Sequence, residues 1–395
     1  MASLTRKVFP NIMAYLPLKE IIVITGMRRV GKSTLLSMIY DSIESGNKVM
    51  LDIENPLDRI IFEEKDYNNI LQNFEKLSIE KGKKIYILLD EIQAYPDIVR
   101  PIKYLYDHYD IKFIVTGSSS FYLKNLFPES LAGRKIEVEL FPLDFDEFIY
   151  FKGATKELVI KATLFSVDKS ELNYHKRIKL YDEYLQYGGF PQVVLASTNE
   201  LKKIYLRDIF KSYFQTDLLQ LTNIKNISQL RDLIILLAVR TGNKIDVTRI
   251  ASELGITRET VYNYLSFLSG SYFFHFISRY GKNADKEISS TQKVYICDNG
   301  IANEISKLTE GQLLESAVYL NLRKYGNVKY YHDKSQREID FVLPDQNFAI
   351  EVKRNAISID FLKLNRFAGS LNIKNKQVIS YNYSNEEGIF PACLL

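Results

Sequence analysis

The chain has 395 residues, of which 46% are hydrophobic and 25% are charged, and its net charge is +4. This composition is typical of a folded protein with two or three domains, and it excludes a largely disordered chain. The two cysteines, Cys297 and Cys393, are too few for a disulfide framework or a zinc cluster. We find no apolar run long enough for a signal peptide or a bilayer span, so we expect a cytoplasmic protein with no membrane partner.

Between residues 18 and 150, short apolar runs alternate with helix-like segments. The runs that we interpret as strands are EIIVIT, KVMLDIE, KKIYILLDE, YDIKFIVTGS and KIEVEL. This alternation predicts a parallel sheet covered by helices on both faces. The helix after the first strand is expected to end just before Gly46.

The first strand leads into the loop GMRRVGKS, residues 26–33, which fits the pattern G-x-x-x-x-G-K-[ST] in full. Glycines let the backbone wrap closely, so that N–H groups and the N-terminal end of the next helix can hold phosphate oxygens. Lys32 is expected to reach the outer phosphates, and Ser33 to ligate Mg²⁺. The pattern predicts that ATP binds with Mg²⁺, and the remaining expected contacts are Gly26, Arg29, Gly31 and Thr34.

The third strand ends in the carboxylate pair Asp90-Glu91. Asp90 is expected to hold magnesium through water, and Glu91 to polarise the water that attacks the nucleotide. The fourth strand ends in polar residues, from Thr116 to Ser120, which would face the γ-phosphate at the carboxyl edge of the sheet. An ordinary serine-rich turn accounts for these residues equally well.

The middle of the chain is mostly helical from about residue 155 to residue 245, with GGFP at residues 188–191 as a turn or hinge. Residues 246–280 then indicate a helix, a tight turn at Gly255, a second helix and a strand, which together predict a winged helix-turn-helix. The second helix, N-capped by Thr257, would expose residue types that can contact phosphates and base edges: Arg258, Glu259, Tyr262 and Asn263. A packing or protein-contact module remains the alternative to DNA binding.

Four residues near the C-terminus could form a second site: Glu315 on a helix, Asp340 on a strand, and Glu351 and Lys353 on the next strand. Alternate strand positions project to one side, so Glu351 and Lys353 lie together and Asp340 can join them. The three carboxylates could hold Mg²⁺, which activates a water and neutralises a phosphodiester, while Lys353 orients that water. A surface salt bridge is the alternative, but acids flanked by apolar residues favour a metal site.

The motifs GMRRVGKST, ILLDEIQ, VTGSSS, LAGR and FPLDFDEF together resemble AAA-type ATPases of a prokaryotic group that carries a C-terminal domain of formerly unknown function. This resemblance implies Walker roles for the loop and the carboxylate pair. It also implies a γ-phosphate sensor at Ser118 or Ser119, and an arginine finger at Arg134 that could reach a neighbouring subunit. The pattern D…E-x-K resembles the PD-(D/E)xK nuclease superfamily, whose fold is restriction-endonuclease-like, although Ile339 stands where a proline is usual.

We therefore expect an α/β chain in four parts. These are a P-loop parallel-sheet ATPase core at residues 1–152, a helical lid at 153–225, a winged helix-turn-helix at 226–284 and a PD-(D/E)xK nuclease-like domain at 285–395. The expected function is ATP hydrolysis by an AAA-type ATPase that acts on DNA and carries a metal-dependent nuclease-like domain. The alternative is a nucleotide-controlled regulator that binds DNA or a protein without cutting. The resemblance leaves both a monomer and a weak homo-oligomer open.

Overall fold

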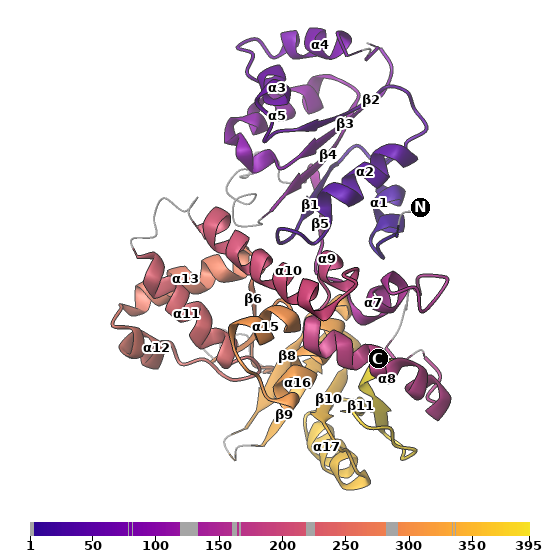
Figure 1. The fold of residues 1–395 in the computed structure, drawn as a ribbon, viewed down its shortest axis with the longest axis vertical. Helices are drawn as coiled ribbons and strands as arrows, with labels where there is room; N and C mark the ends of the chain where they lie inside the picture. Colours follow the sequence, from indigo (N-terminus) through magenta and orange to yellow (C-terminus); the bar gives the residue numbers. More distant parts are fainter. Residues whose placement is uncertain are drawn as a thin grey trace. The chain divides into compact units, whose positions relative to one another are not determined.

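The computed structural model of the chain describes residues 4–77, 79–80, 82–118, 133–159, 164–165, 167–218, 226–281, 291–333, 335 and 337–395. The chain divides into two compact units (Figure 1). The first unit comprises residues 1–141 and 270–272, and the second comprises residues 142–269 and 273–395. Over the described ranges, we find no helix with the length and apolarity that a bilayer span requires.

The first unit is built on a five-stranded parallel sheet in the order β2-β3-β4-β1-β5. Its strands are β1 Ile21–Thr25, β2 Lys48–Asp52, β3 Ile85–Asp90, β4 Ile111–Gly117 and β5 Lys135–Glu139. Its main helices are α1 Phe9–Tyr15, α2 Lys32–Ser42, α3 Pro56–Arg59, α4 Asn68–Glu75 and α5 Val99–His108. All five predicted strands are confirmed, and Figure 1 shows α2 and α5 on opposite faces of the sheet.

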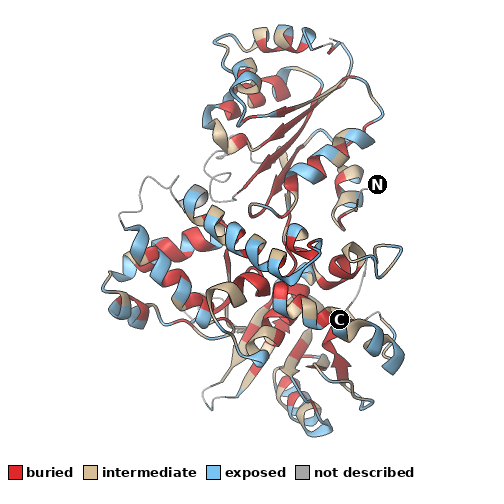
Figure 2. Cartoon of the chain, in the orientation of Figure 1, coloured by how far each residue is buried: buried red, intermediate tan, exposed pale blue. Residues whose placement is uncertain are grey.

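The side-chain alternation of the strands explains this layering. Val23, Ile87 and Phe113 lie in one buried cluster with residues of α4 and α5, such as Ile70 and Ile102. The alternate positions of the same strands point to the other face, where α2 packs against β2, β3 and β4. Strands β1, β3 and β4 are largely buried and the edge strands β2 and β5 only partly so. Figure 2 shows exposed residues on the outer turns of the helices.

Helix α2 ends earlier than the sequence suggests. The predicted helix reaches almost to Gly46, but the observed helix ends at Ser42. Ile43 is extended (φ −78°, ψ 115°) and only 5% exposed, so its side chain leaves the helix to join the core. Burial of one isoleucine therefore overrides the glycine stop signal.

The second unit begins with a series of helices between residues 145 and 270. They are α7 Phe145–Phe151, α8 Glu171–Tyr187, α9 Pro191–Val194, α10 Asn199–Ser212, α11 Ile227–Val239, α12 Val247–Leu254 and α13 Arg258–Gly270. A π-helix, Tyr213–Leu218, extends α10. The predominantly helical middle of the chain is thus confirmed.

The segment after α8 is a packed junction rather than an open hinge. Gly188 has φ 72°, and a Cβ there would lie 2.0 Å from Asp298 Oδ1. The Gly189 N–H donates to Asp298 Oδ2 at 2.6 Å, and the Leu143 N–H donates to the Gly189 carbonyl at 2.7 Å. Pro191 then starts α9. The two glycines are required because a carboxylate and a backbone occupy the space that side chains would need.

Helices α12 and α13 meet at Gly255, which has φ 63° and ends α12 in a left-handed cap. The Thr260 N–H donates to Thr257 Oγ1 at 3.1 Å, so the predicted N-cap of α13 is confirmed. Strands β6 Phe274–Ile277 and β7 Lys293–Ile296 follow and pair antiparallel. Lys244, between α11 and α12, forms an isolated antiparallel bridge to Lys293 of β7.

A second, mixed five-stranded sheet occupies the end of the chain, in the order β12-β11-β10-β9-β8. The remaining elements are α15 Asn299–Ile305, α16 Glu310–Leu322, β8 Lys329–His332, β9 Glu338–Leu343, β10 Phe348–Lys353, α17 Ser358–Ser370, β11 Asn375–Ser380 and β12 Ile389–Pro391. Strands β8, β9 and β10 are antiparallel neighbours, whereas β11 is parallel to β10. One buried cluster joins Val318 of α16 to Phe341 and Ile350, and another joins Leu364 of α17 to Val342 and Val378.

Candidate functional site

The predicted nucleotide loop lies between β1 and α2, at the carboxyl edge of the first sheet. Three of its residues have positive φ: Gly26 (149°), Arg29 (66°) and Gly31 (98°). A Cβ at Gly26 would lie 2.0 Å from the Leu140 carbonyl oxygen, so only glycine fits there. Left-handed residues in such a loop turn neighbouring backbone N–H groups into a concave anion-binding surface.

Lys32 and the two hydroxyl residues begin α2 directly after the loop. Lys32 is 4% exposed, and its Nζ donates to the Gly26 and Met27 carbonyls at 3.0 Å each. Ser33 and Thr34 are exposed on the first turn of α2. The ammonium thus lies over the loop, and the hydroxyls stay accessible to a ligand.

The carboxylate pair ends β3 at the same edge of the sheet. Asp90 is 8% exposed and accepts a hydrogen bond from the Thr116 hydroxyl of β4. The Glu91 N–H donates to the same Thr116 oxygen at 3.1 Å, and Glu91 has a left-handed backbone (φ 51°, ψ 48°). Glu91 Oε1 lies 3.9 Å from Lys32 Nζ. The structure therefore brings the two predicted acids together with the predicted lysine.

Gln93 connects the predicted sensor to the predicted base. Its Nε2 donates to the Glu91 carboxylate and, at 3.0 Å, to Ser118 Oγ. Ser118 is 2% exposed at the end of β4. The second sensor candidate, Ser119, lies outside the described residues. Sequence reasoning missed Gln93, although its place two residues after Glu91 was a usable signal.

Glu54 is a further carboxylate at this edge that the sequence did not single out. It follows β2 and lies 3.8 Å from Arg28 of the glycine loop, measured from Glu54 Oε1 to the arginine NH2. Burial and the nearby Glu91 charge raise the pKa of Glu54. Glu54 therefore lies close to the carboxylates of the predicted nucleotide site.

Arg134 lies away from this site within its own unit. It precedes β5, and its carbonyl accepts from the Ile21 N–H at the start of β1. Its guanidinium lies 3.4 Å from Asp107 Oδ1. In a parallel sheet this is the amino edge, opposite the glycine loop. Arg134 therefore cannot reach its own nucleotide site, and a role as arginine finger on a neighbouring copy stays a prediction.

The structure divides the four C-terminal site candidates into two pairs. Lys353 Nζ lies 2.7 Å from Glu351 Oε1, and both line a cavity of about 510 Å³ against α17. Asp340 accepts from the Val352 N–H at 2.8 Å. Burial, followed by the Asp340 charge, raises the pKa of Glu351, while Glu351 raises the pKa of Lys353 against the opposing effect of burial.

The second pair, Glu315 and Asp340, is joined by a lysine that the sequence did not single out. Lys293 Nζ lies 3.2 Å from Glu315 Oε1, 2.5 Å from Glu338 Oε1 and 3.9 Å from Asp340 Oδ1. Lys293 is 3% exposed. Burial alone would lower the pKa of Lys293, but these carboxylates raise it. Burial and the Asp340 charge likewise raise the pKa of Glu315.

The arrangement of these acids does not fit a metal ion as it stands. Within the described part of the chain, no three His, Cys, Asp or Glu side chains are grouped closely enough to hold one. The positive charge between Glu315, Glu338 and Asp340 is the Lys293 ammonium. We therefore derive no metal-dependent step at this site.

Helix α13 exposes the residues that the sequence expected to face DNA. Arg258, Glu259, Tyr262 and Asn263 are all exposed, with Tyr262 at 59%. Its apolar side, including Val261 and Leu268, is buried. The exposed face could contact a nucleic acid or a protein.

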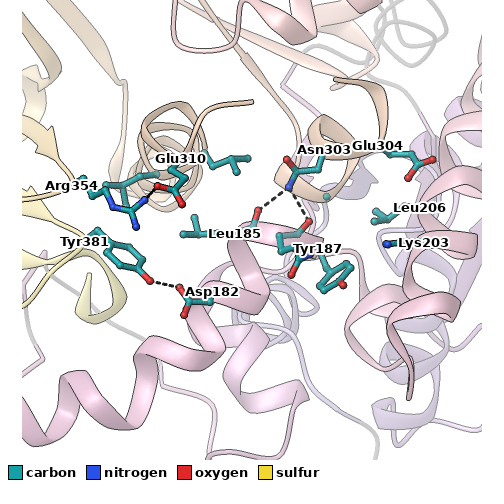
Figure 3. A pocket seen from close by; sticks show the side chains of 14 residues that line it. Asp182, Leu185, Tyr187, Lys203, Leu206, Asn303, Glu304, Glu310, Arg354 and Tyr381 are labelled. Carbon is teal, nitrogen blue, oxygen red and sulfur yellow. Dashed lines mark hydrogen bonds and ion pairs between the residues drawn. The ribbon is translucent and has the colours of Figure 1, made fainter. Parts of the chain in front are cut away.

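A cavity of about 410 Å³ in the second unit was not expected from the sequence (Figure 3). Tyr381 donates its hydroxyl to the carboxylate of Asp182, and Arg354 pairs with Glu310. Burial, and then Asp182, raise the pKa of Tyr381. Because Asp182 and Arg354 already bond to Tyr381 and Glu310, we assign the cavity no ligand.

Three family models match the chain in succession. Residues 18–149 match a model described as an AAA domain. Residues 178–312 and 310–389 match two models described as domains of unknown function, DUF8612 and DUF4143. The description of the last model supplies no activity for the C-terminal sheet.

Relatives extend over most of the chain. Uncharacterized protein MJ1544 of Methanocaldococcus jannaschii is 29% identical over 395 residues, which cover 94% of this chain and 84% of that one. An uncharacterized protein of Haemophilus influenzae is 29% identical over 333 residues, covering 81% and 78%.

Solved structures resemble the chain only distantly. The Aeropyrum pernix ORC1 protein in complex with DNA is 12% identical and has a TM-score of 0.32, with 77% of this chain and 93% of that chain covered. Caenorhabditis elegans PCH-2 is 16% identical and has a TM-score of 0.32, with 52% and 67% covered. Neither similarity is close enough to support a function.

From the glycine loop, the Asp90–Glu91 pair and the family match together, residues 18–149 form an AAA-type P-loop ATPase domain.

Proposed function

We propose that the first unit binds ATP with Mg²⁺ at the loop between Gly26 and Gly31 and hydrolyses it. The observation that carries this proposal is the meeting of Lys32, Asp90 and Glu91 at the edge of the sheet where the loop lies. Transfer of a phosphoryl group to water needs a cation that stabilises the phosphate charge and a residue that orients the attacking water, and Lys32 and Glu91 can supply these.

The donor set at this edge fits such a ligand. The left-handed backbone at Arg29 and Gly31 favours anion binding, and Ser33 with Asp90 offers the hard oxygen atoms that Mg²⁺ prefers. Among the residues that the structure describes, none donates a hydrogen bond to the buried Oε1 of Gln93, which lies next to the Glu91 carboxylate. A buried acceptor of this kind calls for an external donor, such as a water.

Each residue then has a definite task. Bound Mg²⁺ would neutralise charge that develops on the phosphates. Lys32 would exchange a bond to a loop carbonyl for one to a phosphate oxygen, which is a stronger, charge-assisted bond. Glu91, held by Gln93, would accept the proton of the attacking water, and Thr116 would keep Asp90 oriented.

Calorimetric titration with ATP and a phosphate-release assay test this proposal. Lys32→Ala should abolish ATP binding, whereas Glu91→Gln should bind ATP and fail to turn it over. Lys76→Ala, an exposed position on the first turn after α4, is the matched control. Turnover by both site variants at the parent rate would reject the proposed site.

For the second unit, we propose that α13 contacts DNA as the second helix of a winged helix-turn-helix. The order α11, α12, α13, β6, β7 and the antiparallel bridge at Lys244 support this proposal. Arg258 and Asn263 are the exposed groups suited to phosphates and base edges. Replacing both with alanine should weaken binding of a labelled duplex, while Arg231→Ala, at an exposed position of α11, should not. Equal binding by all variants would argue against α13.

The nuclease-like assignment of the C-terminal domain remains a proposal with two supporting features. The order α16-β8-β9-β10-α17-β11, with β11 parallel to β10, is consistent with a restriction-endonuclease-like core. Asp340, Glu351 and Lys353 also lie on its two adjacent strands.

The alternative function, a nucleotide-controlled regulator that binds DNA or a protein without cutting, is favoured by one observation. Lys293 already balances the charge of the acids that a metal would bridge. Incubation of plasmid DNA with the protein, ATP and Mg²⁺ or Mn²⁺ separates the two functions. The regulator predicts intact DNA and binding that changes with nucleotide. Cleavage that Lys353→Ala abolishes would establish the nuclease instead.

A further inference from the structure

The buried lysine of β7 carries an inference beyond the proposed function. Lys293 comes from outside the sheet that holds Asp340 and enters the acidic cluster from β7, which pairs with β6. Three carboxylates from two different elements, Glu315 of α16 and Glu338 and Asp340 of β9, lie within 3.9 Å of its Nζ.

Other groups hold the same acids in this arrangement. The Tyr295 hydroxyl, two residues along β7, donates to Glu315 Oε1 at 2.7 Å. Lys244 Nζ lies 3.0 Å from Glu338 Oε2. Asp340 accepts from the Val352 N–H at 2.8 Å. The cluster is therefore a closed network of donors and acceptors, centred on an ammonium.

The distances around Lys293 Nζ suit an ammonium better than a metal ion. Mg²⁺ binds oxygen atoms at about 2.0–2.1 Å in near-octahedral geometry, and Ca²⁺ at about 2.3–2.6 Å. The oxygens here lie 2.5, 3.2 and 3.9 Å from the nitrogen. A divalent ion at this position would require at least two of the side chains to move inward and the lysine to leave.

We infer that Lys293 is the resident cation of the acidic cluster, so that the native chain takes up no divalent metal between Glu315, Glu338 and Asp340. This inference depends on the nuclease-like prediction in one respect only: that prediction is the reason why a divalent metal is considered as the cation that would compete with Lys293. A consequence is that removing this ammonium takes the central cation from Glu315 and Asp340 and leaves Glu338 paired with Lys244, so the cluster then favours another cation.

Manganese binding to the full-length protein, without nucleotide, tests the inference. The free Mn²⁺ signal in electron paramagnetic resonance is titrated for the native protein, Asp340→Asn, Lys293→Met and the double variant. Lys363→Met, at an exposed position on α17, is the matched control. Comparison with Asp340→Asn separates this cluster from any Mn²⁺ bound at the nucleotide loop.

The expected result is that the native protein and Asp340→Asn bind Mn²⁺ equally. Lys293→Met should gain one site that the double variant lacks, and Mn²⁺ should raise the melting temperature of Lys293→Met alone. The inference is overturned if Asp340→Asn removes a site from the native protein, or if folded Lys293→Met gains none. The comparison of native protein with Asp340→Asn decides the question even if Lys293→Met fails to fold. DNA cleavage is a separate measurement, and its absence would reject the nuclease while leaving this inference intact.

Discussion

The most specific prediction for the nucleotide site concerns Gln93, which bridges the Glu91 carboxylate and the Ser118 hydroxyl. Replacing Gln93 with alanine removes both bonds and leaves the backbone of the glycine loop untouched. Glu91 would then be free to rotate away from the position in which it can accept a proton. Lys32, which we propose binds a phosphate, donates instead to the loop carbonyls of Gly26 and Met27.

The magnitude follows from the bond to Glu91. A hydrogen bond to a charged group contributes about 1.5–3 kcal/mol, and each ~1.4 kcal/mol of lost transition-state stabilisation slows a reaction about tenfold. Gln93→Ala should therefore lower kcat for ATP hydrolysis roughly 10- to 100-fold. The dissociation constant for ATP should change by less than about threefold, because the glycine loop and Lys32 keep their own hydrogen bonds.

Steady-state phosphate release and calorimetric ATP titration measure the two quantities separately. Gln72→Ala, an exposed glutamine of α4 in the same unit, controls for the loss of a glutamine side chain. Gln93→Glu should be at least as slow as Gln93→Ala, since it places a second carboxylate against Glu91. An unchanged kcat, or an ATP affinity that falls as much as kcat does, would refute a positioning role.

Three further predictions concern stability. Burial raises the pKa of Asp298 from 3.8 to about 6. Between these pH values the folded state holds the extra proton, so the contribution of Asp298 to the free energy of unfolding should fall by about 3 kcal/mol as pH rises. Denaturant titrations of the native protein and Asp298→Asn measure this contribution as the pH-dependent difference between them. Gly188→Ala should lower the free energy of unfolding by about 1–3 kcal/mol or more, since only glycine tolerates the backbone geometry of this position. Gly369→Ala on α17, where a Cβ would meet no other atom, should be neutral or stabilising in the same assay. Lys112→Met should lower the melting temperature of the first unit, because three carbonyls, of Tyr15, Leu18 and Glu20, lose their donor; an unchanged melting temperature would contradict this reading.

The sequence predicted the first sheet well because its signals are local. Strands β1, β3 and β4 are short apolar runs and are buried almost throughout, as such runs predict, whereas the edge strands β2 and β5 are partly exposed. The loop is equally local, since its glycines, lysine and serine lie within eight consecutive positions. The error at the end of α2 arose where a local signal, Gly46, competed with burial of Ile43.

Contacts between distant segments could not be predicted in this way. Gln93, which follows β3, donates a hydrogen bond to Ser118, which follows the neighbouring strand β4. Asp298 caps the N-terminus of α15 and also accepts a hydrogen bond from the Gly189 N–H. The quoted motifs contain Gln93, Ser118 and Gly189, but no motif indicates which distant residue each of them contacts. The glycine pair was interpreted as a hinge because the carboxylate that fills the space beside it lies far along the chain.

The acidic cluster around Lys293 could also be predicted only in part from the sequence. Apolar flanks around Asp340 and Glu351 predicted buried acids, and both side chains are partly buried, at 15% and 18% exposure. Buried acids require compensation, and hydrophobic pattern does not distinguish a metal ion from an ammonium as its source. The compensating group, Lys293, lies 22 residues before Glu315 in a short strand whose own sequence is unremarkable. A motif therefore identifies the acids of such a site, whereas the cation that balances them, and with it the capacity for metal chemistry, is determined by tertiary structure.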